Sequence, residues 1–343
     1  MKINRLITAL FVGIFLAACS FDDPVDTGLQ ENRKIELSFS VPAYSLEMTN
    51  GTRAIATRAT DVGSDLEKKI DNLYVFLFPT AGTQTLMKYY IDAATFSGGT
   101  WSTTDKKVTL NLTQAEAGNR NVYVVVNCAD LKTALDGVVS SGDLESVFRT
   151  TAAPWAGNIQ VPILMVGNAT NNFLTNYQLN SVPLTRAIAK IELNVELSSG
   201  FQVAPTGNSS SVTNYRYRYA NFDMKTYVLK PASKTPAIVS SGSDRNPWPT
   251  GGTNDWTAWG NDLAGSADTG TNYTLDGISG KVTGLRIITY LNERDEAGAQ
   301  IEIELPRADG GLLPPPEFGP ERYSVTLPDK IERNKWYRYS ISI

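Results

Sequence analysis

The sequence predicts a mainly β protein composed of two β-sandwich domains. Many short segments alternate polar and apolar residues or are continuously apolar, which is typical of strands. Loops rich in Gly, Pro, Asn and Asp separate these segments, and only one region has the apolar spacing of helices. The chain has 343 residues and is 42% hydrophobic, which is enough for about two domains with buried cores.

The composition excludes several classes of chemistry. Histidine is absent, which removes the commonest general base and a common zinc ligand. The 31 basic and 35 acidic residues give a net charge of -4 and form no basic block that would suit a nucleic acid. A carboxylate cluster at Glu293, Asp295 and Glu296 is interpreted as a solvated turn rather than a glycosidase pair. We therefore expect no enzymatic activity, no cofactor, no metal and no nucleic-acid partner.

The first residues have the features of a bacterial lipoprotein signal peptide. Lys2 and Arg5 precede an apolar run over Leu6–Leu16, which is too short to span a bilayer comfortably. The run closes with the sequence Leu-Ala-Ala-Cys, which matches the small-residue lipobox. We therefore expect residues 1–19 to form the signal peptide and Cys19 to carry acyl chains that hold the protein on a membrane.

A removable strand is predicted after a polar linker over residues 20–33. Four apolar residues alternate with polar ones, as in a strand that buries one face: Ile35, Leu37, Phe39 and Val41. Arg53 and Arg58 follow in a segment rich in Thr, Gly and Ala, a composition that favours exposure to proteases. Residues 34–58 therefore comprise a strand and a loop that contains a candidate cleavage site.

The first domain is predicted over residues 34–184. Leu73–Phe78 is almost entirely apolar and is predicted to be a strand covered on both faces, and Val122–Val126 is a second continuous apolar strand. Between residues 129 and 148 the apolar spacing predicts one or two short helices. Cys128 follows the second strand and is interpreted as a small core residue rather than a nucleophile.

The second domain is predicted over residues 185–343. A long alternating strand opens it, and turn-rich loops separate the strands that follow. These later strands are expected within residues 214–230, 283–291, 301–305 and 336–343. Short strands, many turns and little helix together favour a β-sandwich.

A long loop between Asn246 and Asp262 contains three tryptophans, Trp248, Trp256 and Trp259, among Asn, Asp and Thr residues. Two interpretations are open. The rings can stack on sugars while the polar groups bind hydroxyls, or the rings can bury and pin an irregular loop onto the sandwich. The three tryptophans are therefore candidate ligand contacts.

Five features occur in one order along nearly the whole chain. They are the lipobox at Cys19, Arg58 ahead of Ile70–Phe78, the strand Val122–Asn127, the stretch Arg186–Ile191 and the stretch Lys330–Tyr337. Together they resemble the fimbrillins of Bacteroidetes, which are the subunits of surface pili.

The resemblance implies two transthyretin-like β-sandwich domains and a maturation cycle. A fimbrillin precursor reaches the outer membrane as a lipoprotein, and an arginine-specific protease then cuts it, here after Arg58 with Arg53 as the second choice. The lipidated N-terminal strand leaves, and a strand from another fimbrial subunit replaces it. The implied destination is a surface fimbrium, where a host or bacterial glycan or protein would be the adhesion ligand.

The sequence differs from the pattern of stalk subunits at its C-terminal end. Stalk fimbrillins carry a donor strand beyond the stretch matched by residues 330–343, whereas this sequence ends at Ile343. We therefore expect a tip or minor subunit with an adhesive role. Two alternatives remain, an uncleaved membrane-bound pilus anchor and a stand-alone surface glycan-binding lipoprotein. Only the polymerising subunit requires arginine cleavage followed by capture of a strand.

Overall fold

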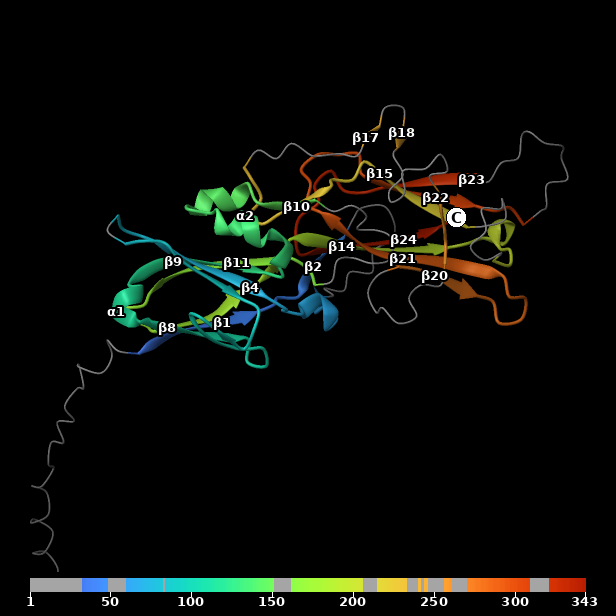
Figure 1. The fold of residues 1–343 in the computed structure, drawn as a ribbon. Helices are drawn as coiled ribbons and strands as arrows, with labels where there is room; N and C mark the ends of the chain where they lie inside the picture. Colours follow the sequence, from blue (N-terminus) through green and yellow to red (C-terminus); the bar gives the residue numbers. More distant parts are fainter. Residues whose placement is uncertain are drawn as a thin grey trace, which may run out of the picture.

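The computed structural model describes residues 33–48, 60–82, 84–150, 162–205, 215–232, 240–241, 244–245, 256–260, 270–308 and 321–343. These residues form a mainly β protein of two sandwiches, which confirms the predicted fold class. Figure 1 shows the two sandwiches side by side, with β2 (Tyr44–Met48) and β10 (Phe148–Thr150) near the region where they meet.

The first sandwich consists of two five-stranded sheets. One has the order β12 (Gln178–Pro183), β1 (Lys34–Ser40), β8 (Lys107–Thr113), β7 (Gly99–Ser102) and β6 (Thr95–Phe96). The other has the order β13 (Thr185–Arg186), β11 (Met165–Asn172), β9 (Asn119–Val126), β4 (Leu73–Pro79) and β5 (Met87–Ile91). Alternate apolar side chains of both sheets point inward and form the core between them.

Strand β4 is covered on both faces, as its sequence predicts. The side chains that point into the core between the sheets are Leu73, Val75 and Leu77. Those that point the other way are Tyr74, Phe76 and Phe78, and they form a second cluster with apolar residues of the short helices. Cys128 is buried in this cluster, where burial raises the pKa of its thiol to about 12, so it is a core residue as predicted.

The predicted helical region contains η2 (Ala129–Leu131), α2 (Lys132–Asp136) and η3 (Ser141–Glu145). A further helix, α1 (Gln114–Ala117), was not predicted. Its start is fixed by a capping box, in which Thr113 and Glu116 each accept a hydrogen bond from the backbone N–H of the other. Two further short 3₁₀ helices are η1 (Leu66–Lys68) and η4 (Ser199–Phe201).

Within the described ranges, no helix is both long enough and apolar enough to cross a membrane.

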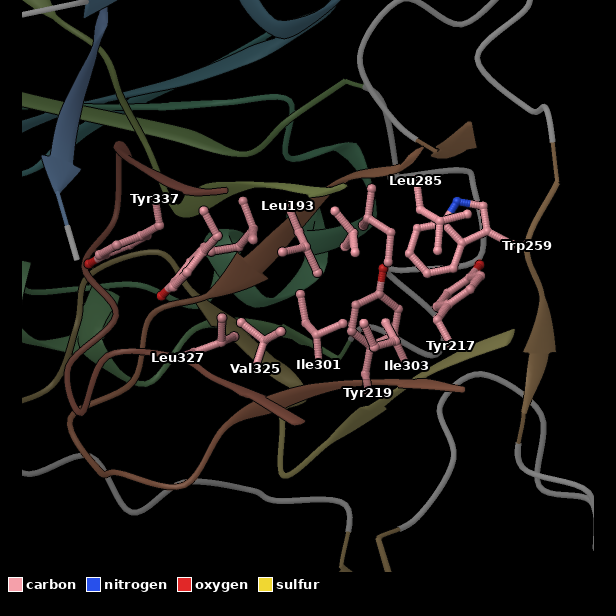
Figure 2. Packing of buried hydrophobic residues seen from close by; sticks show 14 of the residues in the cluster. Leu193, Tyr217, Tyr219, Trp259, Leu285, Ile301, Ile303, Val325, Leu327 and Tyr337 are labelled. Carbon is pink, nitrogen blue, oxygen red and sulfur yellow. The ribbon is translucent and has the colours of Figure 1, made fainter. Parts of the chain in front are cut away.

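The second sandwich packs a six-stranded sheet on a four-stranded one. The larger has the order β20 (Gly270–Leu275), β21 (Val282–Asn292), β14 (Ile188–Glu196), β24 (Lys335–Ser342), β2 and β3 (Thr60–Asp61). The smaller has the order β19 (Thr257–Ala258), β15 (Arg216–Ala220), β22 (Gln300–Leu305) and β23 (Glu321–Thr326). Figure 2 shows Leu193 and Leu285 of the larger sheet packed against Ile301 and Ile303 of the smaller. A separate small pair is β17 (Ser240–Ser241) with β18 (Asp244–Arg245).

The chain crosses between the sandwiches earlier than the sequence indicated. Residues 34–184 were assigned to the first domain, but β2 and β3 pair in the larger sheet of the second. The crossing takes only Val41–Ala43, which separate β1 from β2. A second link is the pair of β10 with β16 (Lys225–Tyr227), which joins a strand of the first domain to one of the second.

Candidate functional site

The N-terminal segment, defined here as residues 33–48, supplies one strand to each sandwich. Strand β1 lies between β12, to which it is parallel, and β8, to which it is antiparallel. Strand β2 lies between β24, to which it is parallel, and β3, to which it is antiparallel. Removal of the segment would therefore open a gap within a sheet of both sandwiches, and we call this gap the slot.

Strand β1 buries the face that its alternating sequence predicts. Ile35 and Leu37 are fully buried, and the buried ring of Phe39 lies 6.0 Å from that of Trp101. Val41 follows the end of the strand and packs half-buried against the same core. At about 1.5–3 kcal/mol each, burial of Ile35, Leu37 and Phe39 contributes roughly 5–9 kcal/mol as an upper bound.

Hydrogen bonds from later parts of the chain hold the crossing between β1 and β2. The carbonyl oxygen of Pro42 accepts a hydrogen bond from the Arg186 guanidinium at 2.8 Å. That of Ala43 accepts one from the Asn334 side-chain amide at 3.0 Å, and the backbone N–H of Ser45 donates to the Asn334 carbonyl at 3.1 Å. The backbone of the crossing is thus bound by residues that line the slot.

A cluster of buried charges lies where the two sandwiches meet. We call it the junction cluster, and its members are Tyr44, Asp61, Glu67, Arg186 and Lys190. Lys190 Nζ lies 2.7 Å from Asp61 Oδ2 and 3.4 Å from Glu67 Oε1. The Arg186 guanidinium lies over the Tyr44 ring, with Cζ 4.1 Å from the ring centroid. Each buried ion thus has an oppositely charged or aromatic neighbour, which offsets its desolvation.

The junction cluster shifts the titration of two of its members. Burial acts to raise the pKa of Asp61, but hydrogen bonds from Lys190 and from the backbone N–H of Gly63 outweigh it and lower the pKa. Burial, followed by the nearby Glu67 carboxylate, raises the pKa of Tyr44 well above its usual value. At neutral pH Asp61 is therefore charged and Tyr44 is neutral.

Several predicted site residues lie outside the described part of the chain, namely Cys19, Arg53, Arg58 and Trp248. Residues 49–59, which contain both arginines, connect β2 to β3. A break of the chain within them would leave the N-terminal segment held to the rest of the protein by non-covalent contacts alone.

Trp259 is a core residue. It is 1% exposed and, as Figure 2 shows, lies in the core of the second sandwich next to Tyr217, with ring centroids 5.3 Å apart. Its indole N–H donates to the carbonyl oxygen of Asn272 at 3.1 Å. The ring has no face open to a sugar, so Trp259 is buried in the core, as the second interpretation of the tryptophans has it, and is not placed to contact a ligand.

Trp256 lies instead among charged side chains beside the smaller sheet of the second sandwich. The guanidinium carbons of Arg218 and Arg322 lie 4.4 and 5.2 Å from its ring centroid. Arg218 pairs with Glu302, and Arg322 pairs with Glu304 at 2.9 Å. In the part of the chain that the structure describes, no group of His, Cys, Asp and Glu side chains is arranged to hold a metal ion.

Neither β2 nor the junction cluster was predicted from the sequence. The signal for β2 was present, because apolar and polar residues alternate over Tyr44–Met48. The cluster has no local signal. In the sequence, Arg186 and Lys190 are ordinary charges in one alternating stretch. The fold divides this stretch between β13 and β14 and brings Asp61 and Glu67 to it.

The fold and the slot define a class of proteins. Its members consist of two sandwiches, and an N-terminal segment completes both of them. The family model of the major fimbrial subunit protein (FimA) matches residues 36–211. The family model of the C-terminal part of the minor fimbrium tip subunit MfA4 matches residues 187–342. The first match alone spans more than half of the chain, and the chain belongs to this family of fimbrial subunits.

Within the family, the chain is 48% identical to the minor fimbrium tip subunit MfA4 of Porphyromonas gingivalis, with 100% of both chains covered. The solved tip fimbrial protein Mfa3 of the same organism, with a C-terminal truncation, is 13% identical with a TM-score of 0.45, covering 90% of this chain and 94% of that one. A fimbrial assembly protein of Parabacteroides distasonis is 13% identical with a TM-score of 0.39, covering 90% of each chain. The chain is thus a fimbrial subunit similar to minor tip subunits, and it functions in a cell-surface fimbrium.

Proposed function

We propose that this protein is an adhesive tip or minor subunit that is exported as a lipoprotein, matured by an arginine-specific protease and assembled by strand exchange. Cys19 carries the lipid of the precursor in the outer membrane, and the cut follows Arg58 or Arg53. A strand of a neighbouring fimbrial subunit then replaces the N-terminal segment. The supporting observation is that the segment completes both sandwiches and is followed directly by the residues that contain both arginines.

The contacts of the N-terminal segment explain why cleavage would lead to exchange. While the segment is in place, it pairs with the backbone of β12, β8, β24 and β3. Its departure leaves these strands with unpaired N–H and C=O groups beside an apolar groove, which is a template for strand addition. An intact precursor fills its own slot, so it has no open template and remains a monomer.

The position of β24 supports a subunit in which this strand stays in place during assembly. Strand β24 pairs with β14 on one side and with β2 on the other, and both pairs are parallel. Tyr337 and Tyr339 of β24 are buried in the core of the second sandwich. Withdrawal of β24 to serve as a donor would therefore open that core.

Adhesion to a glycan or protein ligand is proposed for the surface around Trp256, and Trp248 stays a candidate contact from the sequence alone. Trp256 is half-buried, and the guanidinium groups of Arg218 and Arg322 beside its ring are charged hydrogen-bond donors. Replacement of Trp256 by Ala should weaken ligand binding by the folded protein. Unchanged binding by a folded Trp256→Ala variant would refute this part of the proposal.

The maturation step is tested by comparing protein in sheared fibres with protein in the membrane. We expect the fibre form to begin at Ala59, and an Arg53→Ala/Arg58→Ala variant to stay lipidated at Cys19 and absent from fibres. Arg33→Ala is the matched control, because Arg33 is an exposed arginine upstream of β1 and its loss should leave assembly unchanged.

Each alternative outcome has a distinct meaning. Normal incorporation of the double variant into fibres would contradict the proposed cleavage. Wild-type protein found only in the membrane, with its N-terminal segment retained, would instead favour an anchor subunit or a stand-alone glycan-binding lipoprotein.

A further inference from the structure

We propose that the slot contains a subsite that selects an aromatic side chain in the strand that enters it. The subsite consists of the buried cations Arg186 and Lys190, and Tyr44 of the N-terminal segment occupies it in this structure. The inference rests on the proposed strand exchange and adds a specificity to it. The incoming strand of the neighbouring subunit carries Tyr or Phe at the position that matches Tyr44.

Tyr44 makes contacts that an aliphatic residue cannot reproduce. Its side chain is 0% exposed, and Arg186 Cζ and Lys190 Nζ lie 4.1 and 5.7 Å from its ring centroid. Both distances fall within the range of about 6 Å over which a cation is attracted to an aromatic face. Arg186 and Lys190 are themselves buried, so the attraction acts away from water, where it is strongest.

The other contacts of the N-terminal segment discriminate less between sequences. The hydrogen bonds to the carbonyl oxygens of Pro42 and Ala43 involve the backbone of the segment, so other residue types at these two positions can accept them equally well. The inward side chains of β1 pack in an apolar core, which tolerates other apolar residues of similar volume. At position 44, by contrast, an aliphatic side chain would leave the buried guanidinium face of Arg186 without an electrostatic partner on that side.

Residues outside the N-terminal segment hold both cations in place. Arg186 donates to the carbonyl oxygen of Glu67 at 3.0 Å and to Asn334 Oδ1 at 2.9 Å, and Lys190 donates to Asp61 Oδ2 at 2.7 Å. All of these partners follow the proposed cleavage site in the sequence, so they stay with the mature chain. The subsite is therefore preformed, which lowers the cost of binding an incoming ring.

The subsite also fixes the register of the incoming strand. Tyr44 follows Phe39 by five residues, and the chain crosses from one sandwich to the other between them. A shift by one residue would turn the apolar side chains of the β1 position outward and would move the aromatic ring away from the cations. We therefore expect a donor strand with alternating apolar residues and with an aromatic residue five positions after the one that takes the place of Phe39.

Competition between synthetic peptides tests the subsite. A specific protease site inserted between residues 49 and 59 of the full chain allows the N-terminal segment to be cut from the rest, and peptides of residues 33–48 then compete with it for the slot. One peptide carries Tyr44→Phe, and a second carries pentafluorophenylalanine at position 44, which has a similar shape but lacks the negative face of the ring. We expect the fluorinated peptide to bind about tenfold or more weakly.

The matched control is a peptide with pentafluorophenylalanine at position 39, because the Phe39 ring lies beside Trp101 rather than over a cation. This control should lose no affinity relative to its parent peptide. Equal affinity of the two peptides that differ at position 44 would overturn the subsite and leave strand exchange intact. Failure of the unmodified peptide to displace the cut segment would overturn strand exchange itself, and the subsite with it.

Discussion

Lys190 and Asp61 form an ion pair between two strands of the larger sheet of the second sandwich, with Nζ and Oδ2 2.7 Å apart. Asp61 ends β3, the first strand after residues 49–59, and Lys190 lies on β14, an internal strand of the larger sheet. The backbone N–H of Gly63 also donates to Asp61, which fixes the carboxylate. The pair therefore ties β3 to β14 through side chains, in addition to the backbone pairing of β3 with β2.

Loss of the Lys190 ammonium group should destabilise the protein strongly. Lys190→Met removes the cation that faces the buried Glu67 carboxylate and the partly buried Asp61 carboxylate. We expect the free energy of unfolding to fall by about 3–5 kcal/mol, measured by urea denaturation. Lys132→Met is the control, because Lys132 pairs with Asp136 on the surface and should cost less than about 1 kcal/mol. Equal losses in the two variants would contradict a stabilising role of the buried pair.

The lowered pKa of Asp61 predicts a pH dependence of stability. A carboxyl group whose pKa is lowered by folding stabilises the protein above its unfolded-state pKa, and this contribution is lost as the pH falls through the folded-state pKa. We expect stability to decline below about pH 4, and Asp61→Asn to flatten that decline in thermal unfolding scans. Asp65→Asn serves as the control, because the Asp65 side chain is fully exposed. The same acid profile in wild type and Asp61→Asn would refute the prediction.

Truncation of Phe39 should weaken the packing of the N-terminal segment against the first sandwich. Phe39→Ala leaves a cavity beside Trp101 and should cost about 3–5 kcal/mol of stability. After a cut between residues 49 and 59, the variant segment should also dissociate faster than the wild-type segment. Lys34→Ala, an exposed change on the same strand, should alter neither quantity appreciably. Dissociation at the wild-type rate would show that burial of β1 does not retain the segment.

The two described tryptophans should respond differently to truncation. Trp259→Ala empties a core position and removes an indole that donates to the Asn272 carbonyl, so we expect a loss of about 3–5 kcal/mol. Trp256→Ala removes a half-buried ring that lies close to two guanidinium groups and should cost about 1–2 kcal/mol. Denaturation of both variants gives the comparison, and an equal or larger loss at Trp256 would contradict the structure.

Features encoded by local periodicity were predictable from the sequence. The continuous apolar run in β4 indicates a strand covered on both faces, and alternation in β1 indicates which side chains are buried. Such patterns depend on the residues of one element alone. The number of sandwiches was also predictable from the sequence, because chain length and hydrophobic content limit how many cores can form.

Features that depend on pairing between distant elements were not predictable in the same way. The sequence of β2 carries the alternation of a strand, but nothing in it specifies β24 as the neighbour or the second sandwich as the location. The junction cluster depends on that pairing, since Tyr44 reaches Arg186 only when β2 lies in the other domain. Trp259 shows the same limit, because an aromatic residue in a polar loop has the same composition whether its ring is buried or exposed.

The placement of β1 and β2 between two neighbours each has a mechanical consequence. Hydrogen bonds between strands run across the strand axis, so a pull along the N-terminal segment loads many of them together in shear instead of unzipping them from one end. Because the segment is anchored in both sandwiches, neither sheet bears the tension alone. A donor strand seated in the same way would resist the drag of flowing fluid on a fibre with the combined strength of two sheets.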